Sequence, residues 1–249
     1  MKKYCKNILV IVIGIVAYFM CSNTYAKEIV YTNKNGMELD TAEYNFFKTV
    51  YGEKFLKYLD QDTYDLYSDV DFENPNVQTR KVYSNENGVT RDSNTFFSSP
   101  AKSLQISNVC GNLFCRIILT ATWLGEPTNK SYDDIGIYLD GPTKLTNPLT
   151  TAYSELASNN EYTTKYDPNG LGFGAVIHIP IGEEVVVTQN FIYQGTGTIY
   201  GSYQHAMSNS TTTTAQMFNI SPIGYGSVFG FYGDALDIYD DMPGVYIEV

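Results

Sequence analysis

Hydrophobic and polar residues alternate in short runs along the second half of the chain, and Gly, Pro, Asn and Asp separate the runs. Alternation with a period of two is typical of strands that bury one face, and the residues between the runs are typical of turns. One flat sheet cannot bury six or more such strands on one side. The pattern therefore predicts a mainly β fold, with an antiparallel β-sandwich over residues 102–249.

The run from 115 to 123 shows which side chains should face the core. Alternate positions are apolar and end in Trp123, the only tryptophan of the chain. Side chains two residues apart share a face of a strand, so we expect Trp123 to be a core residue and not an exposed ligand platform. Comparable inward rows are expected at Ile135, Ile137 and Leu139; at Phe173, Ala175, Ile177 and Ile179; at Val185, Val187, Phe191 and Tyr193; at Ile199, Gly201, Tyr203 and His205; and at Val245, Ile247 and Val249.

Residues 40–69 follow a helical period instead. Asp40 and Glu43 have the spacing of a capping box, and Gly52 is expected to divide the segment into two helices. We expect the apolar stripe to pack on the rest of the protein; the alternative is a helical hairpin that binds a partner. The stripe consists of Tyr44, Phe47, Tyr51, Phe55 and Tyr58.

Three lysines, an apolar run from 8 to 21 and small residues before position 27 predict a secretory signal peptide. The run is shorter than the roughly 20 residues that span a bilayer, and no second stretch is long enough. An uncleaved anchor and lipidation of Cys21 are lesser alternatives. The predicted organisation is a signal peptide at 1–26, a helical N-terminal segment at 27–70, a linker or loops at 71–101 and the β-sandwich at 102–249.

The charge of the chain narrows the possible partners. Removal of residues 1–26 takes away three lysines and no acid, so the formal net charge goes from -11 to -14. Nucleic-acid backbones are held by Lys and Arg, and the sequence has no basic cluster. We therefore exclude nucleic acid as a partner and expect a secreted protein, extracellular or at the cell surface.

Cys110 and Cys115 are the two cysteines left after signal cleavage. In an oxidising compartment two cysteines most simply form a disulfide, here across a tight hairpin. A structural zinc site needs four ligands, and only His178 and His205 could add to the pair. A structural disulfide is therefore expected.

Four tyrosines suggest a binding surface. Tyr138, Tyr200, Tyr232 and Tyr246 each lie on the strand face opposite an apolar row. Exposed aromatic side chains commonly mark a recognition surface, and flat rings could stack on sugars. The alternative is that these tyrosines serve packing alone, with the helical segment covering them.

Candidate chemistry is sparse. Neither His178 nor His205 has a nucleophile-elbow sequence nearby, and no pair of acids stands out for glycoside cleavage. No cofactor is expected. Two interpretations of the acidic loops stay open: they bind calcium, or they are ordinary solvated loops. The acids concerned are Asp133, Asp134 and Asp140, and above all Asp234, Asp237, Asp240 and Asp241.

The signal peptide, the segment "LDTAEYNFFKTVYGEKFLKYLDQDTYDLY", the segment "CGNLFCRIILTATWLGEPTNKSYDDIGIYL" and "GTIYGSYQHA" together resemble a group of exported proteins of Gram-positive bacteria whose function is unassigned. The resemblance implies secretion and a β-rich C-terminal domain, with Cys110, Cys115 and Trp123 as structural residues. It implies no active site.

Together these features favour a secreted, non-enzymatic binding module for a glycan, cell-wall or protein partner. The main alternative is a secreted glycan hydrolase with two carboxylates. A pore-forming protein is a lesser alternative: residues 201–231 are rich in Ser and Thr, but the run 211–214 does not alternate.

Overall fold

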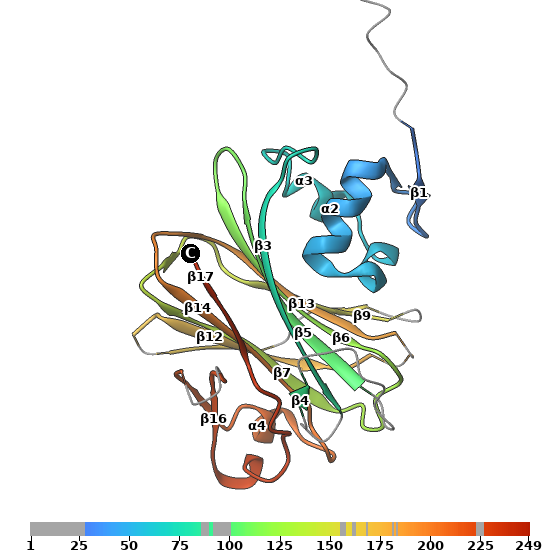
Figure 1. The fold of residues 1–249 in the computed structure, drawn as a ribbon. Coiled ribbons are helices and arrows are strands. Elements are labelled where there is room, and N and C mark those ends of the chain that lie inside the picture. Colours follow the sequence, from blue (N-terminus) through green and yellow to red (C-terminus); the bar gives the residue numbers. More distant parts are fainter. Residues whose placement is uncertain are drawn as a thin grey trace, which may run out of the picture.

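The computed structural model describes residues 28–85, 90–91, 101–154, 158–160, 163–167, 169–180, 182, 184–222 and 227–249. Two antiparallel sheets pack face to face, as predicted (Figure 1). A helical segment covers the outer face of the larger sheet, and a C-terminal segment covers part of the outer face of the smaller sheet. The predicted signal peptide lies outside the described residues.

The larger sheet holds eight strands among the described residues, in the order β10-β9-β13-β6-β5-β3-β4, with β8 beside β13. The neighbouring strands β5 and β6 form the hairpin that contains both cysteines. The strands are β3 (Asn76–Asn85), β4 (Thr90–Arg91), β5 (Ala101–Cys110), β6 (Cys115–Trp123), β8 (Thr143–Lys144), β9 (Leu149–Tyr153), β10 (Ser158–Asn160) and β13 (Val186–Gln194).

The smaller sheet holds five strands of the described chain, in the order β11-β12-β7-β14-β17. β7 lies at its centre between β12 and β14, and β17, the last described strand, lies at one edge. The strands are β7 (Tyr132–Asp140), β11 (Thr163–Tyr166), β12 (Gly172–His178), β14 (Thr198–Gln204) and β17 (Val245–Glu248).

The core between the sheets confirms the predicted inward faces. Alternate residues of β6, β7, β12, β13 and β17 meet in one cluster, and Trp123 within it is completely buried. Hydrophobic burial of this kind is worth about 25 cal/mol per Å² of apolar surface, so the cluster stabilises the packing of the two sheets. Trp123 is therefore a core residue, as its position in the row predicted.

The helical segment begins and divides where the sequence predicted. Helix α2 (Thr41–Tyr51) carries the Asp40–Glu43 capping box, and Gly52 follows it with a φ of 89°. A positive φ is unfavourable for side chains with a Cβ, so the chain turns at this glycine. The short helices η1 (Glu53–Lys57) and α3 (Gln61–Asp65) follow, and a hairpin of β1 (Tyr31–Thr32) and β2 (Glu38–Leu39) precedes α2.

This segment packs on the larger sheet. Val109, Ile118 and Val186 point from β5, β6 and β13 into the aromatic cluster of the helices. The side chains of Gln105 and Ser107 on β5 donate hydrogen bonds to the carbonyl oxygen of Val50 near the end of α2, at 2.9 and 2.8 Å. The expected packing of the helical stripe on the rest of the protein is confirmed, and these strands are buried on both faces.

The sequence prediction of a linker or loops over residues 71–101 was wrong for residues 76–85. Strand β3 runs for ten residues through this region and pairs with the whole length of β5. Most of its side chains are exposed or half-buried, and the strand lies near one edge of the larger sheet. Polar residues are tolerated at such positions, so the sequence of this strand shows no clear alternation of apolar residues.

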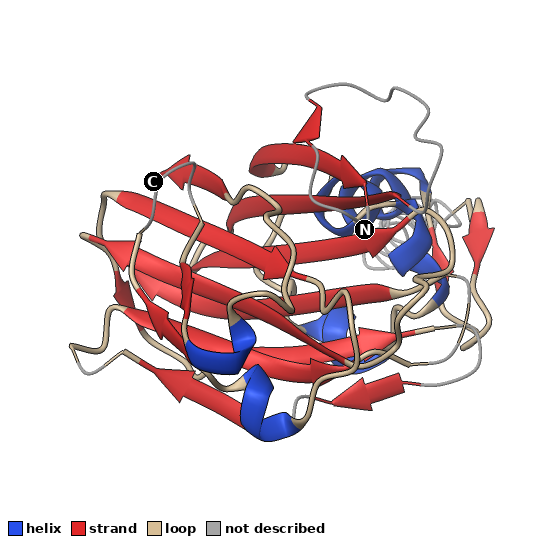
Figure 2. Cartoon of the chain, turned by 90° about the horizontal axis from the view of Figure 1, so that it is seen from below, coloured by secondary structure: helices blue, strands red, loops and turns tan. Residues whose placement is uncertain are grey.

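The predicted sandwich at 102–249 also needs a correction, because its last part is not all sandwich. Four short elements lie on the outer face of the smaller sheet: α4 (Thr212–Ala215), β15 (Phe218–Ile220), β16 (Phe229–Phe231) and η3 (Gly233–Ala235). Together with the residues that follow them up to Asp240, they are called the C-terminal segment. Figure 2, seen from below, shows short helices in front of the strands, on the side where Figure 1 labels α4. A Cβ at Gly136 or Gly174 would come within 3.0 Å of the Phe229 ring, so glycines on β7 and β12 make room for this layer.

None of the helices in the described part of the chain combines the length and the apolar character needed to cross a membrane.

The β5–β6 hairpin is closed by the predicted disulfide between Cys110 and Cys115. Asp69, which follows the helical segment, holds the hairpin loop: its carboxylate accepts hydrogen bonds from the backbone N–H groups of Leu113 and Phe114, and from the Arg116 guanidinium at 2.6 Å. Burial by itself would raise the pKa of Asp69, but the hydrogen bonds from Arg116 and the backbone lower it below its ordinary value.

We expect Asp69→Asn to lower the free energy of unfolding by about 2 kcal/mol at neutral pH, because Arg116 stays buried without its carboxylate. The folded-state pKa of Asp69 is lowered, so its stabilisation is present above the unfolded pKa of about 4 and is lost as the pH falls through the folded value. The difference between the two proteins should therefore shrink in acid. Urea unfolding with the disulfide intact measures both effects.

Glu73→Gln removes an exposed carboxylate from the same stretch and is the matched control. It should leave the free energy of unfolding almost unchanged. A loss for Asp69→Asn that is equally large in acid would contradict the assigned role of the Asp69 carboxylate.

Candidate functional site

Three of the four predicted tyrosines lie side by side on the outer face of the smaller sheet. Tyr200 on β14 is the register partner of Tyr138 on β7 and of Tyr246 on β17. Directly opposed residues of antiparallel strands have their Cβ atoms about 5 Å apart, on the same face. Tyr138, Tyr200 and Tyr246 thus form a continuous row across three strands, called the tyrosine row below.

The row is partly accessible. The rings of Tyr200 and Tyr246 have their centroids 6.1 Å apart at an angle of 40°, and Tyr246 is 38% exposed. Tyr138 and Tyr200 are half-buried, because the C-terminal segment packs against one side of them. The guanidinium of Arg80, on β3, lies 3.8 Å from the centre of the Tyr246 ring, within the range of a cation–π contact.

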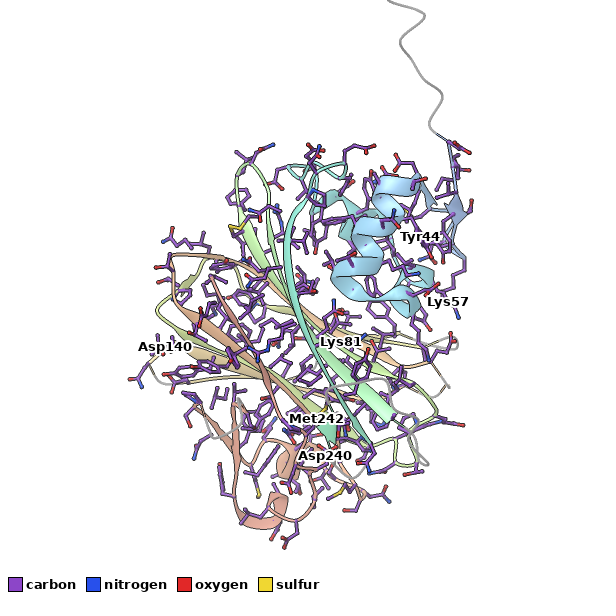
Figure 3. The ribbon with its side chains drawn as sticks, in the orientation of Figure 1. Tyr44, Lys57, Lys81, Asp140, Asp240 and Met242 are labelled. Atoms are coloured by element: carbon purple, nitrogen blue, oxygen red, sulfur yellow. A yellow bond between two sulfur atoms is a disulfide. The ribbon has the colours of Figure 1, made fainter. Side chains whose placement is uncertain are left out.

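Polar side chains border the row. Thr198 lies two residues before Tyr200 and is the register partner of Asp140 on one side and of Glu248 on the other. Both carboxylates are exposed, and all three side chains share the face of the tyrosine row because strand faces repeat every two residues. Asp140 lies at the edge of the molecule in Figure 3. The face thus combines aromatic rings with hydrogen-bond acceptors.

Tyr232 does not belong to this row. It follows β16, which pairs with β15 and not with the strands of the smaller sheet, and it is 45% exposed. The sequence grouped it with the other tyrosines because it also alternates with apolar residues. Strand β16 belongs to the C-terminal segment. Alternation along the chain cannot show with which other strands a given strand pairs.

The acids proposed for calcium do not gather into a site. In the described ranges of the chain, no three His, Cys, Asp or Glu side chains lie together in a way that could hold a metal ion. Asp240 is fully engaged inside the protein, and Figure 3 places it far from Asp140. The other three residues of the group, Asp234, Asp237 and Asp241, are exposed.

A buried polar cluster at one end of the core escaped the sequence analysis. The indole N–H of Trp123 donates to the Tyr203 hydroxyl at 3.0 Å, and that hydroxyl donates to the Asp133 carboxylate. Nδ1 of His205 lies 3.0 Å from both oxygens of the same carboxylate, and the His205 ring stands edge-on to Trp123. Burial, and then the charge of Asp133, raise the pKa of Tyr203 well above its ordinary value.

This cluster cannot serve a large substrate in the observed conformation. Trp123, Asp133, Tyr203 and His205 are all completely buried, and so is Asp134, the neighbour of Asp133. His205 is therefore hydrogen-bonded inside the core, in agreement with its place in the predicted inward row. His178 is half-buried on the outer face of β12, where its ring stands edge-on to Tyr132.

A pocket of about 310 Å³ lies between α2 and the start of β3. Phe46, Phe72 and Val77 contribute its apolar wall, and Glu73 is the one carboxylate among its lining residues. A single carboxylate does not provide the pair that glycoside cleavage requires. The tyrosine row is thus a better candidate for a functional site than this pocket.

No protein-family model and no curated protein matches the sequence. Among solved structures, the chain is similar to the crystal structure of the KRT10-binding region domain of the pneumococcal serine rich repeat protein PsrP. The likeness covers 52% of this chain and 89% of that one, with 11% sequence identity and a TM-score of 0.30. At that level the likeness supports no functional inference, and the function is inferred below from the sequence and the site.

Tyr203→Phe should lower the free energy of unfolding by about 2 kcal/mol, because it leaves the buried indole N–H of Trp123 without its acceptor and takes a donor from Asp133. Guanidinium unfolding monitored by Trp123 fluorescence measures the effect. Tyr246→Phe, which removes the hydroxyl of an exposed ring, should change the stability by only a few tenths of a kcal/mol. Equal stabilities of the two variants would show that the cluster contributes nothing to the fold.

Proposed function

We propose that the protein is an extracellular, non-enzymatic binding module that recognises a glycan without anionic groups through the tyrosine row. The observation that carries the proposal is the alignment of Tyr138, Tyr200 and Tyr246 on adjacent strands of one sheet face. Planar rings at strand spacing offer a stacking platform for successive sugar rings. A rigid sheet also keeps the platform in place without an ordering cost on binding.

The charges around the row favour this class of ligand. Exposed carboxylates of Asp140 and Glu248 can accept hydrogen bonds from sugar hydroxyl groups, and Arg80 beside Tyr246 can donate them. The excess of acid along the chain disfavours an anionic polymer, because binding one requires Lys or Arg. A neutral or amino-sugar glycan fits both features.

Two features support an extracellular setting. The predicted signal peptide directs the chain out of the cytoplasm, and the Cys110–Cys115 disulfide is stable in oxidising compartments. The resemblance to exported Gram-positive proteins agrees with this setting. A cell-wall glycan or a glycosylated surface protein would then be within reach of the row.

The hydrolase alternative finds less support in the geometry. The adjacent acids Asp133 and Asp134 are completely buried, and they cannot meet a polysaccharide. Asp140 and Glu248 flank Thr198 on one sheet face instead of facing each other across a cleft. Glycoside cleavage places the scissile bond between two carboxyl groups, and this arrangement does not provide that.

The test is binding of the full-length chain to an array of neutral and amino-sugar glycans and to purified cell-wall fractions. We expect saturable binding to at least one ligand, and Tyr246→Ala should weaken it tenfold or more, which corresponds to about 1.4 kcal/mol. Tyr232→Ala removes an equally exposed tyrosine outside the row and should bind like the wild type.

Three outcomes would count against the proposal. Absence of binding to every glycan and wall fraction would overturn glycan recognition. Equal losses for Tyr246→Ala and Tyr232→Ala would remove the tyrosine row as the site. Release of reducing sugars by the wild type, abolished in Asp140→Asn or Glu248→Gln, would establish the hydrolase instead.

A further inference from the structure

An ion pair is enclosed in the protein beside the polar cluster of Trp123. Nζ of Lys102 is in contact with Oδ2 of Asp240, and both side chains are completely buried. Lys102 is at the start of β5 and faces the core, because it shares a strand face with Leu104 and Ile106. Asp240 precedes β17, at the end of the C-terminal segment, 138 residues further along the chain.

The surroundings of this pair are unusual for two charges. Lys102 is the register partner of Trp123 on β6, and Nζ lies 5.2 Å from the centre of the indole ring. Transfer of an ammonium and a carboxylate from water to such a site costs several kcal/mol for each ion. The neutral amine and carboxylic acid avoid that cost, and one proton passed from Lys102 to Asp240 produces them.

The second oxygen of Asp240 is held by the backbone. The N–H groups of His205 and Met242 both donate to Oδ1, each at 3.3 Å, while Lys102 contacts Oδ2. Figure 3 shows Asp240 and Met242 next to each other at this end of the sandwich. The carboxyl group is therefore presented with an amine beside one oxygen and two N–H donors at the other.

We propose that Lys102 and Asp240 form an intramolecular amide bond, which cross-links β5 to the C-terminal segment. After the proton transfer, the uncharged Nζ attacks Cγ of Asp240, and a tetrahedral centre forms with its negative charge on Oδ1. The two backbone N–H groups stabilise that charge in the manner of an oxyanion hole. No oxidant or added group is required.

The step is balanced in atoms and charge. The protonated Oδ2 takes a proton from the attached nitrogen and leaves as water, and the electron pair on Oδ1 restores the C=O bond. The ammonium and the carboxylate are thus converted into one amide and one water molecule. Lys102, Asp240 and the surrounding fold supply every group, and burial in the core favours the uncharged amide over the ion pair.

His205 is a positioning residue for this reaction. Its ring is fixed by Asp133 and by the edge-on contact with Trp123, while its backbone N–H reaches Asp240. The polar cluster therefore sets one of the two donors on Oδ1. This gives the buried cluster a role that stability alone does not explain.

The test is the intact mass of the protein produced from the full sequence, measured after denaturation and reduction. We expect a mass lower by one water than that calculated for the observed N-terminus. Proteolysis should release a branched peptide that joins the segment of Lys102 to the segment of Asp240, and tandem mass spectrometry should place the link between these residues.

Variants separate the link from other losses of water. Lys102→Met and Asp240→Ala should both show the full calculated mass, whereas Lys57→Met, which breaks the half-exposed ion pair with Glu184, should keep the loss of water. Asp240→Asn is the sharpest variant, because an amide formed from asparagine releases ammonia in place of water. A succinimide at Asp140-Gly141 would also lose water, but Lys102→Met would not abolish that loss.

A mass equal to the calculated value in the wild type, with no branched peptide, would overturn the proposal and leave a buried ion pair. A loss of water that persists in Lys102→Met would overturn it as well. The branched peptide is measured on the wild-type protein and on Lys57→Met, so this readout establishes or excludes the link whether or not the core variants fold.

Discussion

Both sheets of the sandwich carry apolar side chains on both faces, and the rest of the fold follows from the need to cover the outer ones. The larger sheet presents Val109, Ile118 and Val186 outward, and the aromatic helical segment buries them. The smaller sheet presents Val176, which the C-terminal segment covers with Phe218 and Phe229. Apolar surface removed from water is the dominant favourable contribution to folding, so the chain forms four layers where a simple sandwich would have two.

The candidate site is the part of the smaller sheet that the C-terminal segment leaves accessible. Tyr138 and Tyr200 lie at the border, with one side packed and the other open, and Tyr246 lies beyond it. A tyrosine tolerates such a position because its ring is apolar and its hydroxyl can remain in water. The packing interpretation is therefore confirmed for Tyr138 and Tyr200, except that the C-terminal segment and not the helical segment covers them. Ligand binding by the accessible rings stays a proposal.

Local sequence patterns predicted what depends on neighbours along the chain. The inward rows, the capping box of α2, the turn at Gly52 and the disulfide all belong to this kind, because a period or a short spacing determines them. Strand β3 was missed because it is polar on most positions and gains its structure from pairing with β5. The alignment of the tyrosine row and the separation of Tyr232 depend on strand order, which no local pattern contains.

The contact between Lys102 and Asp240 joins residues 138 positions apart, so no local sequence pattern could predict it. The contact and the polar cluster beside it connect both sheets with the C-terminal segment. Lys102 comes from the larger sheet, and Asp133 comes from the smaller sheet. His205 directly follows β14 of the smaller sheet, and Asp240 comes from the segment that covers that sheet. Hydrogen bonds to buried polar groups have strict geometry, so a shift of one sheet against the other would leave these buried groups without their partners. The C-terminal segment, fixed at Asp240, in turn determines how much of the tyrosine row stays open, which connects the buried cluster to the proposed binding face.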